Sequence, residues 1–330
     1  MHLALGTVLL VLKIVFVPVA LLLGAGWLIL GERRLLGWIQ IRLGPNRAGP
    51  WGLLQPAADV VKLLTKEDLV PEGADRWIFL YAPAVVAVTA MLMFAVAPFG
   101  DTWTFFGMRF PLIVTDLNVG LLFVLALSSI SVYGVALGGW ASNSKFSLLG
   151  GIRGAAQMIS YELSLGLALV PVVMLAQSFS LVDIVQAQAK YPFILVQPVA
   201  FLIFFISSVA EAKRIPFDLP EAENELVAGY HTEYSGMRFA LYFLGEYVTV
   251  IVLGALVAVF FLGGWRGPLL PPVLWFFLKV AAVVFVLIWL RGTLPRLRYD
   301  QLMHLGWKIL IPAALLNIVA TGGLALLIKG

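Results

Sequence analysis

The sequence predicts an all-α polytopic membrane protein, and three observations carry this prediction. Hydrophobic residues make up 61% of the 330 residues and charged residues only 12%, whereas soluble domains carry about 25% charged residues. Eight apolar runs come close to the roughly 20 residues that a helix needs to cross the hydrocarbon core. Lysine and arginine are concentrated in alternate segments between these runs. We therefore expect a single transmembrane domain, 1–330, of eight helices with structured cytoplasmic loops.

The eight predicted spans follow one another along the whole chain. They lie near 8–30, 78–98, 117–139, 155–176, 193–210, 239–262, 273–290 and 308–328. The first run is long enough to span, so no cleavable secretory signal is predicted. The fifth is short and is flanked by Pro192 and Pro198, which leaves its outer end poorly defined. In the third, the spacing of Gly134 and Gly138 is typical of closely packed helices.

The distribution of basic residues predicts the orientation. Sixteen of the 22 lysines and arginines are Lys308 or lie in segments 31–77, 140–154, 211–238 and 291–307. Positive charge of this kind marks the cytoplasmic side, so these segments are expected to be cytoplasmic and both termini to lie outside. Lys279 falls within the seventh span, where we expect its ammonium group to reach the outer interface.

The residue types argue against several kinds of site. The chain has no cysteine, so disulfides, cysteine-ligated zinc and cysteine-ligated iron–sulfur clusters are excluded. The three histidines, His2, His231 and His304, show no metal-ligand spacing. We therefore predict no metal site in this chain.

The first cytoplasmic segment combines a turn with a polar stripe. The run GPNRAGP at 44–50 predicts a turn. From Leu53 to Lys66 the polar residues recur at helical spacing on one stripe, which consists of Gln55, Asp59, Lys62 and Lys66. The stripe is narrow and of mixed charge, which favours a helix embedded at the interface with its polar line facing a cavity or another subunit. An ordinary interfacial helix is the alternative.

Two glutamates lie inside predicted spans. Glu162 and Glu246 each lie about seven residues into a span, on the order of 10 Å from the cytoplasmic side. Neither has a lysine or arginine within a helical turn in its own span. Isolated carboxyl groups at that depth are poised to exchange protons, so we interpret the pair as part of a hydrated proton path. The alternative is a structural hydrogen bond to a nearby hydroxyl, such as that of Ser160, Tyr161, Ser164 or Tyr247.

The segment 211–238 is an acidic loop, with six of the 18 acidic residues of the chain. A short helix is predicted from Glu221 to Tyr230, with Glu221 and Glu225 on one face. Clustered carboxylates titrate as a set and respond to a change in nearby charge. A solvated loop is the alternative, but the apolar residues between the acids favour a folded, partly buried loop.

Long motifs in the cytoplasmic segments carry a family resemblance. The blocks at 31–67, 139–163, 211–237 and 291–308, including PFDLPEAENELVAGYHTEYSGM and RYDQLM, resemble the H subunit of proton-pumping NADH:quinone oxidoreductase. This enzyme is respiratory complex I, and its H subunit corresponds to subunit 1 of the mitochondrial NADH dehydrogenase. The resemblance implies a multi-pass protein of a bacterial inner membrane, at the heel of the L-shaped complex. Its partners would be other membrane-arm subunits, the quinone-site subunits of the peripheral arm and the lipid bilayer, with no nucleic acid.

The resemblance also implies roles for individual residues. The quinone tunnel would be lined by Arg33, Arg34, Asp59, Lys62, Arg214, Glu223, Glu225, Glu233 and Arg291. The proton path would run through Glu162, Glu211 and Glu246. No catalytic residue and no bound cofactor are expected in this chain. Quinone is the implied substrate, and FMN and iron–sulfur clusters would belong to partner subunits.

These observations lead to a hypothesis for function. Quinone reduction would change the charge near the acidic loop, and the change would be relayed to the intramembrane glutamates. The alternative is the equivalent subunit of a related complex fed by ferredoxin or a reduced deazaflavin, or of a membrane-bound hydrogenase. A stand-alone transporter is disfavoured because the inner loops show no inverted repeat.

Overall fold

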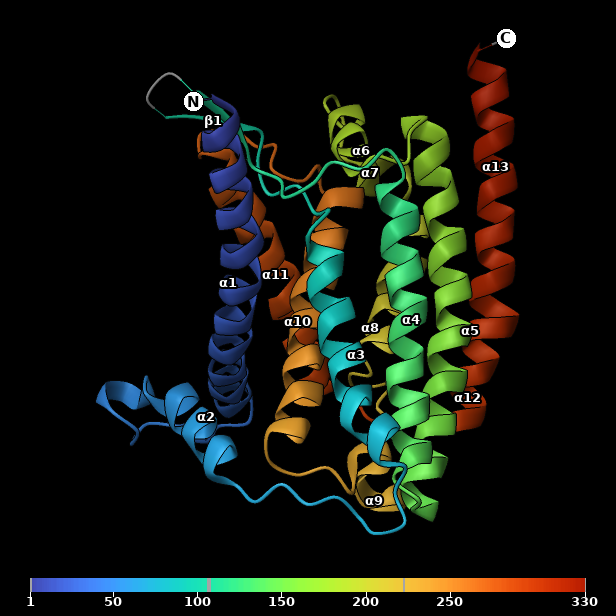
Figure 1. Cartoon of the computed structure of the whole chain (residues 1–330). Helices are drawn as coiled ribbons and strands as arrows, with labels where there is room; N and C mark the ends of the chain where they lie inside the picture. The colour runs from blue at the N-terminus through green and yellow to red at the C-terminus, as the bar shows by residue number, and fades with distance from the viewer. Residues whose placement is uncertain (1, 106–107, 222, 330) are drawn as a thin grey trace.

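The computed structural model describes residues 2–105, 108–221 and 223–329, and its regular structure is almost entirely helical (Figure 1). The bundle consists of α1 (His2–Ile39), α3 (Arg76–Phe94), α4 (Gly120–Ala141), α5 (Lys145–Ala176), α8 (Pro198–Glu211), α10 (Gly236–Phe261), α11 (Pro272–Thr293) and α13 (Ile311–Lys329). The shorter elements are η1 (Pro50–Gly52), α2 (Gln55–Thr65), β1 (Thr102–Phe105), β2 (Met108–Pro111), α6 (Leu181–Ala187), α7 (Phe193–Val196), α9 (Glu223–Leu226), η2 (Gly229–His231), α12 (Tyr299–His304) and the π-helical η3 (Leu305–Leu310).

The long helices stand side by side, with α1 at one edge of the bundle and α13 at the other (Figure 1). Helix α1 begins and α13 ends at the same end of the bundle, where β1, β2, α6 and α7 also lie. Helices α2, α9 and α12 lie toward the opposite end. The segments that charge predicts to be cytoplasmic therefore gather at one end.

Seven helical stretches of the described chain are long and apolar enough to cross a membrane. They correspond to all of the predicted spans except the fifth. At that position α8 has 14 residues, and at about 1.5 Å per residue it is shorter than a hydrocarbon core of about 30 Å.

A break at Gln197 explains why α8 is short. Pro198 begins α8 and holds Gln197 out of helical geometry, with φ −129° and ψ 58°. The Gln197 side chain bridges the break to the last helix, donating to Thr321 at 2.9 Å and accepting from Asn317 at 3.0 Å. The two short helices α7 and α8 are thereby fixed against α13.

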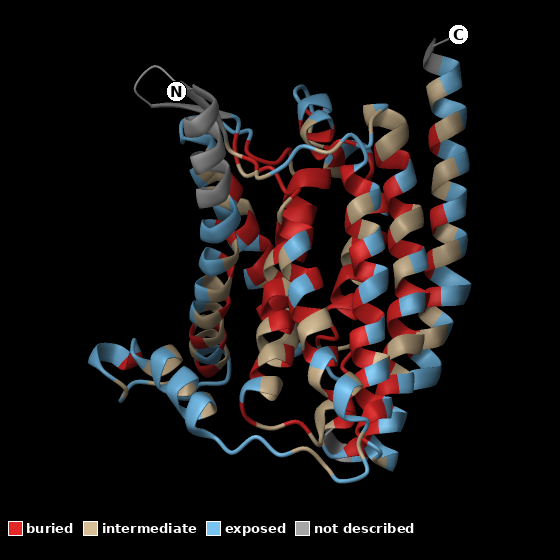
Figure 2. Ribbon diagram, in the orientation of Figure 1, coloured by how far each residue is buried: buried red, intermediate tan, exposed pale blue. Residues whose placement is uncertain are grey.

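Helix α10 is the centre of the bundle. In its spanning stretch 78% of the residues are buried, against 17% in the stretch that contains α13. Figure 2 shows the buried residues concentrated on α10 and on the helix faces turned toward it. Because protein surrounds α10, this helix can hold a polar side chain away from lipid.

Glycines allow α4 to approach α3 and α10 closely. A Cβ on Gly134 would lie 2.5 Å from Val86 Cγ2 of α3, and a Cβ on Gly138 would overlap the Tyr242 hydroxyl of α10. The Tyr242 hydroxyl instead donates to the Gly134 carbonyl at 2.8 Å. The close helix packing predicted from this spacing is confirmed.

The structure corrects two predicted elements and adds one. The addition is a short antiparallel hairpin of β1 and β2 between α3 and α4; the segment 102–111, TWTFFGMRFP, is rich in residues that favour strands. Helix α1 continues past residue 30 to Ile39. The helix predicted from Glu221 to Tyr230 is wrong: it is divided into α9 and η2, and Val227 between them has a φ of 65°.

Candidate functional site

Four charged side chains form a buried cluster near the end of the bundle that carries α2, α9 and α12. The Arg214 Nη1 lies 3.2 Å from Glu32 Oε1, and its Nε lies 2.8 Å from Glu246 Oε1. Arg291 also bonds Glu32. We call these residues, Glu32, Arg214, Glu246 and Arg291, the arginine–glutamate cluster.

Four separate elements bring the cluster together. Glu32 lies in α1, which reaches this level because it continues to Ile39. Arg214 follows the end of α8, Glu246 projects from the buried helix α10, and Arg291 lies in the last turn of α11. Glu246 is therefore not the isolated carboxylate that its own span suggests, because its cationic partner comes from the neighbouring loop.

The cluster balances its charges, and one nitrogen of Arg214 has no hydrogen-bond partner in the described structure. The side chains of Glu32, Arg214 and Glu246 are each less than 10% exposed, and two carboxylates face two guanidinium groups. Removing one partner of such a buried pair leaves an uncompensated charge. The Arg214 Nη2 is buried without a hydrogen-bond partner in the described structure, and the centre of the Tyr247 ring lies 4.3 Å from the guanidinium carbon.

Adjacent serines of α4 bond Glu211 and Glu162, the other two glutamates of the predicted proton path. Ser128 bonds Glu211 at the end of α8, and Ser129 bonds Glu162 of α5. Glu211 is 6% exposed, whereas Glu162 is half-buried. The hydroxyl partner of Glu162 thus comes from another helix and not from the nearby Ser160, Tyr161 or Ser164.

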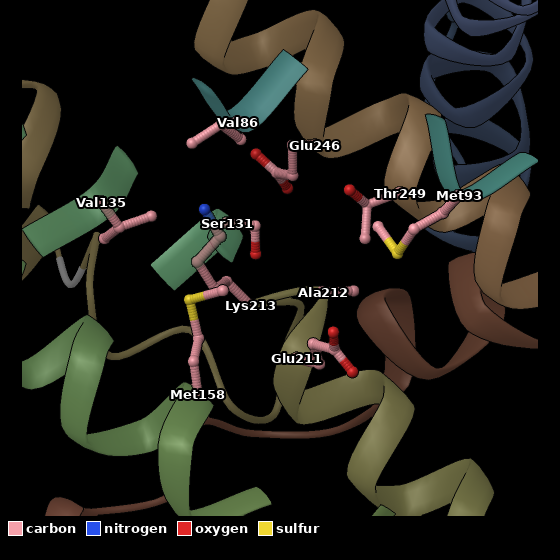
Figure 3. A pocket seen from close by; sticks show the side chains of 10 residues that line it. All are labelled: Val86, Met93, Ser131, Val135, Met158, Glu211, Ala212, Lys213, Glu246 and Thr249. Carbon is pink, nitrogen blue, oxygen red and sulfur yellow. The ribbon is translucent and has the colours of Figure 1, made fainter. Parts of the chain in front are cut away.

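A small cavity separates Glu211 from Glu246 (Figure 3). Its volume is about 20 Å³, and a site needs at least about 10–15 Å³ and several polar partners to hold a water molecule. The polar lining comes from Glu211, Lys213, Glu246, Ser131 and Thr249. The cavity is therefore large and polar enough for one bridging water between the two carboxylates.

The acidic loop packs against the last cytoplasmic segment. Asp218 is buried and accepts a hydrogen bond from Arg296 at 2.9 Å. Burial raises the pKa of Asp218 to about 6, against the lowering effect of Arg296. Burial also raises the pKa of Glu221, and Asp218 reinforces this rise. The predicted partly buried loop is supported here, and its acids interact as a set.

One residue of the predicted polar stripe, Asp59, joins α2 to α1. Asp59 accepts from Gln55 at 2.9 Å and from Arg33 of α1 at 3.0 Å. Lys62 is exposed and Arg34 is half-buried. The Arg33–Asp59 pair is part-exposed, with the two side chains 44% and 28% accessible, so its contribution to stability is small.

Other predicted site residues lie away from the buried cluster. Glu225 pairs with Arg153 of α5 at 2.6 Å, but the Glu225 side chain is 59% exposed. Glu233 is half-buried. The side chain of Glu223 lies outside the described residues. The structure therefore joins Arg214, Arg291 and Glu246 in one site, whereas Glu225 pairs with Arg153 instead.

An apolar groove is lined by residues that neighbour two cluster residues in sequence. Its volume is about 570 Å³ and it runs between α1, α10 and α11, open on one side. Gly31 and Leu35 of α1 line it, and Glu32 lies between them in sequence. Ile288 lines it on α11, three residues before Arg291.

Three contributors to the site were not predicted from the sequence. Glu32 was not singled out because the first span was expected to end at residue 30, whereas the carboxylate lies within a helix that continues beyond it. Lys213 and Asp218 were counted only as loop charges, yet both are buried. The apolar residues around them were the available signal, since a charge next to apolar neighbours in a folded loop is often buried.

Comparison with known proteins agrees with the motif resemblance. A profile of the family described as NADH dehydrogenase matches residues 12–322. The NADH-quinone oxidoreductase H subunit 2 of Syntrophobacter fumaroxidans is 71% identical over 317 residues, 96% of each chain. The protein of the same name from Geobacter sulfurreducens is 68% identical over 94% of each chain, and the NADH-quinone oxidoreductase H subunit of Syntrophotalea carbinolica is 60% identical over 95% of each. The chain belongs to the family of NADH-quinone oxidoreductase H subunits.

Membership of the H-subunit family confirms the resemblance predicted from the cytoplasmic motifs. Those motif blocks supply Glu32, Arg214 and Arg291 of the arginine–glutamate cluster, while Glu246 comes from α10. The residues on which the resemblance rests therefore meet in space around a carboxylate inside the bundle.

Proposed function

We propose that this chain is the membrane-arm subunit of a bacterial NADH:quinone oxidoreductase that lines the quinone tunnel and couples quinone reduction to proton translocation. Family membership supports the enzyme class, since the relatives carry that name. The observation that carries the coupling role is the arginine–glutamate cluster, which is separated by a water-sized cavity from Glu211.

The quinone tail fits the apolar groove between α1, α10 and α11. Its volume of about 570 Å³ lies within the range of small-molecule sites, roughly 300–1,000 Å³. A polyprenyl tail is apolar and needs no polar partner along this lining. The groove leads past Gly31 and Ile288 toward Glu32 and Arg291, so a headgroup moving inward meets the cluster and then the cytoplasmic segments.

Quinone reduction would be coupled to proton movement through the charge of the headgroup. A buried guanidinium such as Arg214 stays charged, so a change in the protonation of a nearby headgroup must be compensated by the carboxylates. Glu246 can take up or release a proton in response and exchange it with Glu211 through the cavity water. Ser128 and Ser129 continue the path from Glu211 to Glu162.

Eight membrane crossings are the topology that suits this arrangement. Helix α1 begins and α13 ends at the same end (Figure 1), which requires an even number of crossings. Seven stretches qualify by length and composition, so α7 and α8 together supply the eighth. By the positive-inside rule the α2 end is cytoplasmic and both termini lie on the outer side of the inner membrane.

The cytoplasmic end is the surface for partner subunits. Helix α2, whose residues are exposed or half-buried throughout, lies at the membrane interface with Asp59 and Arg33 at the tunnel mouth. Glu223, Glu225 and Glu233 of the acidic loop face the peripheral arm, whose subunits hold the FMN and iron–sulfur clusters. Lys62 and Arg34 belong to the same surface.

The second candidate is the equivalent subunit of a complex fed by ferredoxin or a reduced deazaflavin. Either donor suits the proposed site, because electron entry is expected to take place on partner subunits. Identification of the copurified subunits distinguishes the two, since an NADH-binding flavoprotein supports the first and its absence the second.

Photo-crosslinking tests the tunnel. A quinone analogue with a photoreactive group on its tail should label the α1 and α11 residues of the groove, and excess native quinone should abolish the label. Label confined to the segments at the β1–β2 end would contradict the proposal.

A further inference from the structure

Lys213 is a buried cation to which the proposed function assigns no role. It lies two residues after the end of α8 and is 5% exposed. Its Nζ donates to the Tyr230 hydroxyl at 3.0 Å and lies 4.7 Å from the centre of the Tyr230 ring. Its backbone has a φ of 53°. Non-glycine residues in this left-handed conformation are uncommon, and such outliers concentrate at functional sites.

The side chain lies between two sets of acidic groups. On one side it lines the cavity between Glu211 and Glu246 (Figure 3). On the other side its bond to Tyr230 joins it to η2 and to the acidic loop. The titratable and charged groups around it are Glu211 of α8, Glu246 and Tyr242 of α10, Tyr230 of η2, and Arg214, Asp218 and Glu221 of the loop.

Lysine differs chemically from the other cations of this region. Arg214, Arg291 and Arg296 keep their protons at any physiological pH, whereas a buried lysine can lose one. Burial lowers the pKa of Lys213, while the carboxylates of Glu246 and Glu221 raise it again. Lys213 therefore places a group that can exist with or without its proton between the cavity and the acidic loop.

The Tyr230 hydroxyl can form a hydrogen bond with Lys213 in its charged and in its neutral state. It accepts a hydrogen bond from the ammonium group, and by rotating it can donate one to the neutral amine. Burial raises the pKa of Tyr230 well above its ordinary value, so the hydroxyl keeps its proton throughout.

We propose that Lys213 carries protons between the acidic loop and the cavity that joins Glu211 to Glu246. The ammonium group gives a proton through the cavity water to the Glu246 carboxylate, which forms a neutral amine and a neutral carboxylic acid. The amine then takes a proton from Glu221 or Asp218. Each transfer conserves charge and needs no other reactant. The inference rests on the proposed proton path and adds a carrier to it.

The test compares two variants in the purified complex reconstituted into vesicles. Lys213→Met removes both the charge and the proton, whereas Lys213→Arg keeps the charge but cannot release the proton. NADH:quinone turnover and proton uptake are measured across pH. Lys190→Met is the control, because Lys190 is exposed and lies between α6 and α7, which are at the opposite end of the bundle (Figure 1). Electron transfer to an artificial acceptor and native gels report on assembly.

We expect both Lys213 variants to assemble and to pump at least about tenfold more slowly, as for the loss of a general acid–base group, with a changed pH profile. Normal pumping and a normal pH profile in either variant would overturn the inference. Proton translocation would then need only a fixed positive charge at this position, as in Lys213→Arg, or no charge at all, as in Lys213→Met. If Lys213→Arg does not assemble, Lys213→Ala with added primary amines decides: recovery of pumping that depends on the pKa of the amine supports a carrier, and no recovery refutes it. Normal pumping in Glu246→Gln and Glu211→Gln would instead refute the proposed proton path itself.

Discussion

Arg214 holds the buried cluster together, because its guanidinium group lies against both Glu32 and Glu246. Replacing it with methionine would leave Glu32 with Arg291 and would remove the guanidinium group that pairs with Glu246. Loss of one partner of a buried pair costs about 3–5 kcal/mol. We expect Arg214→Met to lower the melting temperature of the purified complex and to abolish quinone reduction. Arg298→Met is the control, since the Arg298–Asp300 pair is 76% and 68% exposed; equal melting temperatures for the two variants would contradict the assignment.

Asp218 gives the folded protein a predictable pH dependence. Its pKa rises from the ordinary 3.8 to about 6 on burial, which corresponds to roughly 3 kcal/mol. The folded state holds this proton more tightly than the unfolded chain, so the contribution is fully present below pH 4 and is lost as pH rises to about 6. Asp218→Asn should remove this component from the melting temperature measured between those pH values, while the exposed Asp300→Asn should keep it. An unchanged pH dependence in Asp218→Asn would contradict the burial argument.

Individual site residues were predictable where one stretch of sequence contains the signal. The depth of Glu162 and Glu246 in their spans could be counted from sequence. The partners could not: Ser129 lies 33 positions from Glu162, and Arg214 lies 182 positions from Glu32. Pairing of this kind depends on which helices become neighbours, and the apolar pattern of a membrane helix does not specify its neighbours.

At the scale of single helices, α4 tests the close packing of the bundle. Gly138→Ala would place a Cβ on the Tyr242 hydroxyl, and overpacking of this kind costs about 1–3 kcal/mol. Gly166→Ala in α5 meets no atom within 4 Å and should be neutral or stabilising, since alanine is favoured over glycine in a helix by about 0.5–1 kcal/mol. We expect a lower melting temperature only for Gly138→Ala. Equal melting temperatures for Gly138→Ala and Gly166→Ala would contradict the close packing of α4 against α10.

Lys279 stabilises the end of α10. Its Nζ donates to the carbonyls of Leu262, Gly264 and Arg266 at 2.6–2.8 Å, just beyond the last turn of that helix. The sequence predicts only that the Lys279 ammonium group reaches the interface, whereas in the structure it also bonds these three carbonyls. Removing these charge-assisted bonds in Lys279→Met should cost about 2 kcal/mol, seen as a lower melting temperature relative to Lys190→Met. Equal melting temperatures would refute the capping role.

The elements themselves were largely predictable from hydropathy, because a membrane helix must satisfy its backbone internally and needs a continuous apolar run. The failures have local causes. The β1–β2 hairpin lies in the connection between α3 and α4, where that constraint does not apply, and the loop helix 221–230 is interrupted at Val227. Helix α8 is short because Pro198 breaks the fifth run.

In the whole molecule, the groove, the arginine–glutamate cluster and the cavity are adjacent. The groove residue Gly31 precedes Glu32, Arg214 connects Glu32 to Glu246, and the cavity separates Glu246 from Glu211. In the proposed mechanism, a change of charge at the inner end of the groove acts on the proton path through the guanidinium group of Arg214. We propose that redox chemistry on a quinone drives proton movement in this way.

The most direct test of this coupling is the number of protons translocated per electron pair by the reconstituted complex carrying Glu246→Gln. We predict that proton translocation or quinone reduction is severely impaired while electron transfer to an artificial acceptor is unchanged. Glu162→Gln should behave similarly, and the exposed Glu72→Gln should pump normally. Full proton stoichiometry in Glu246→Gln and Glu162→Gln would contradict the central claim.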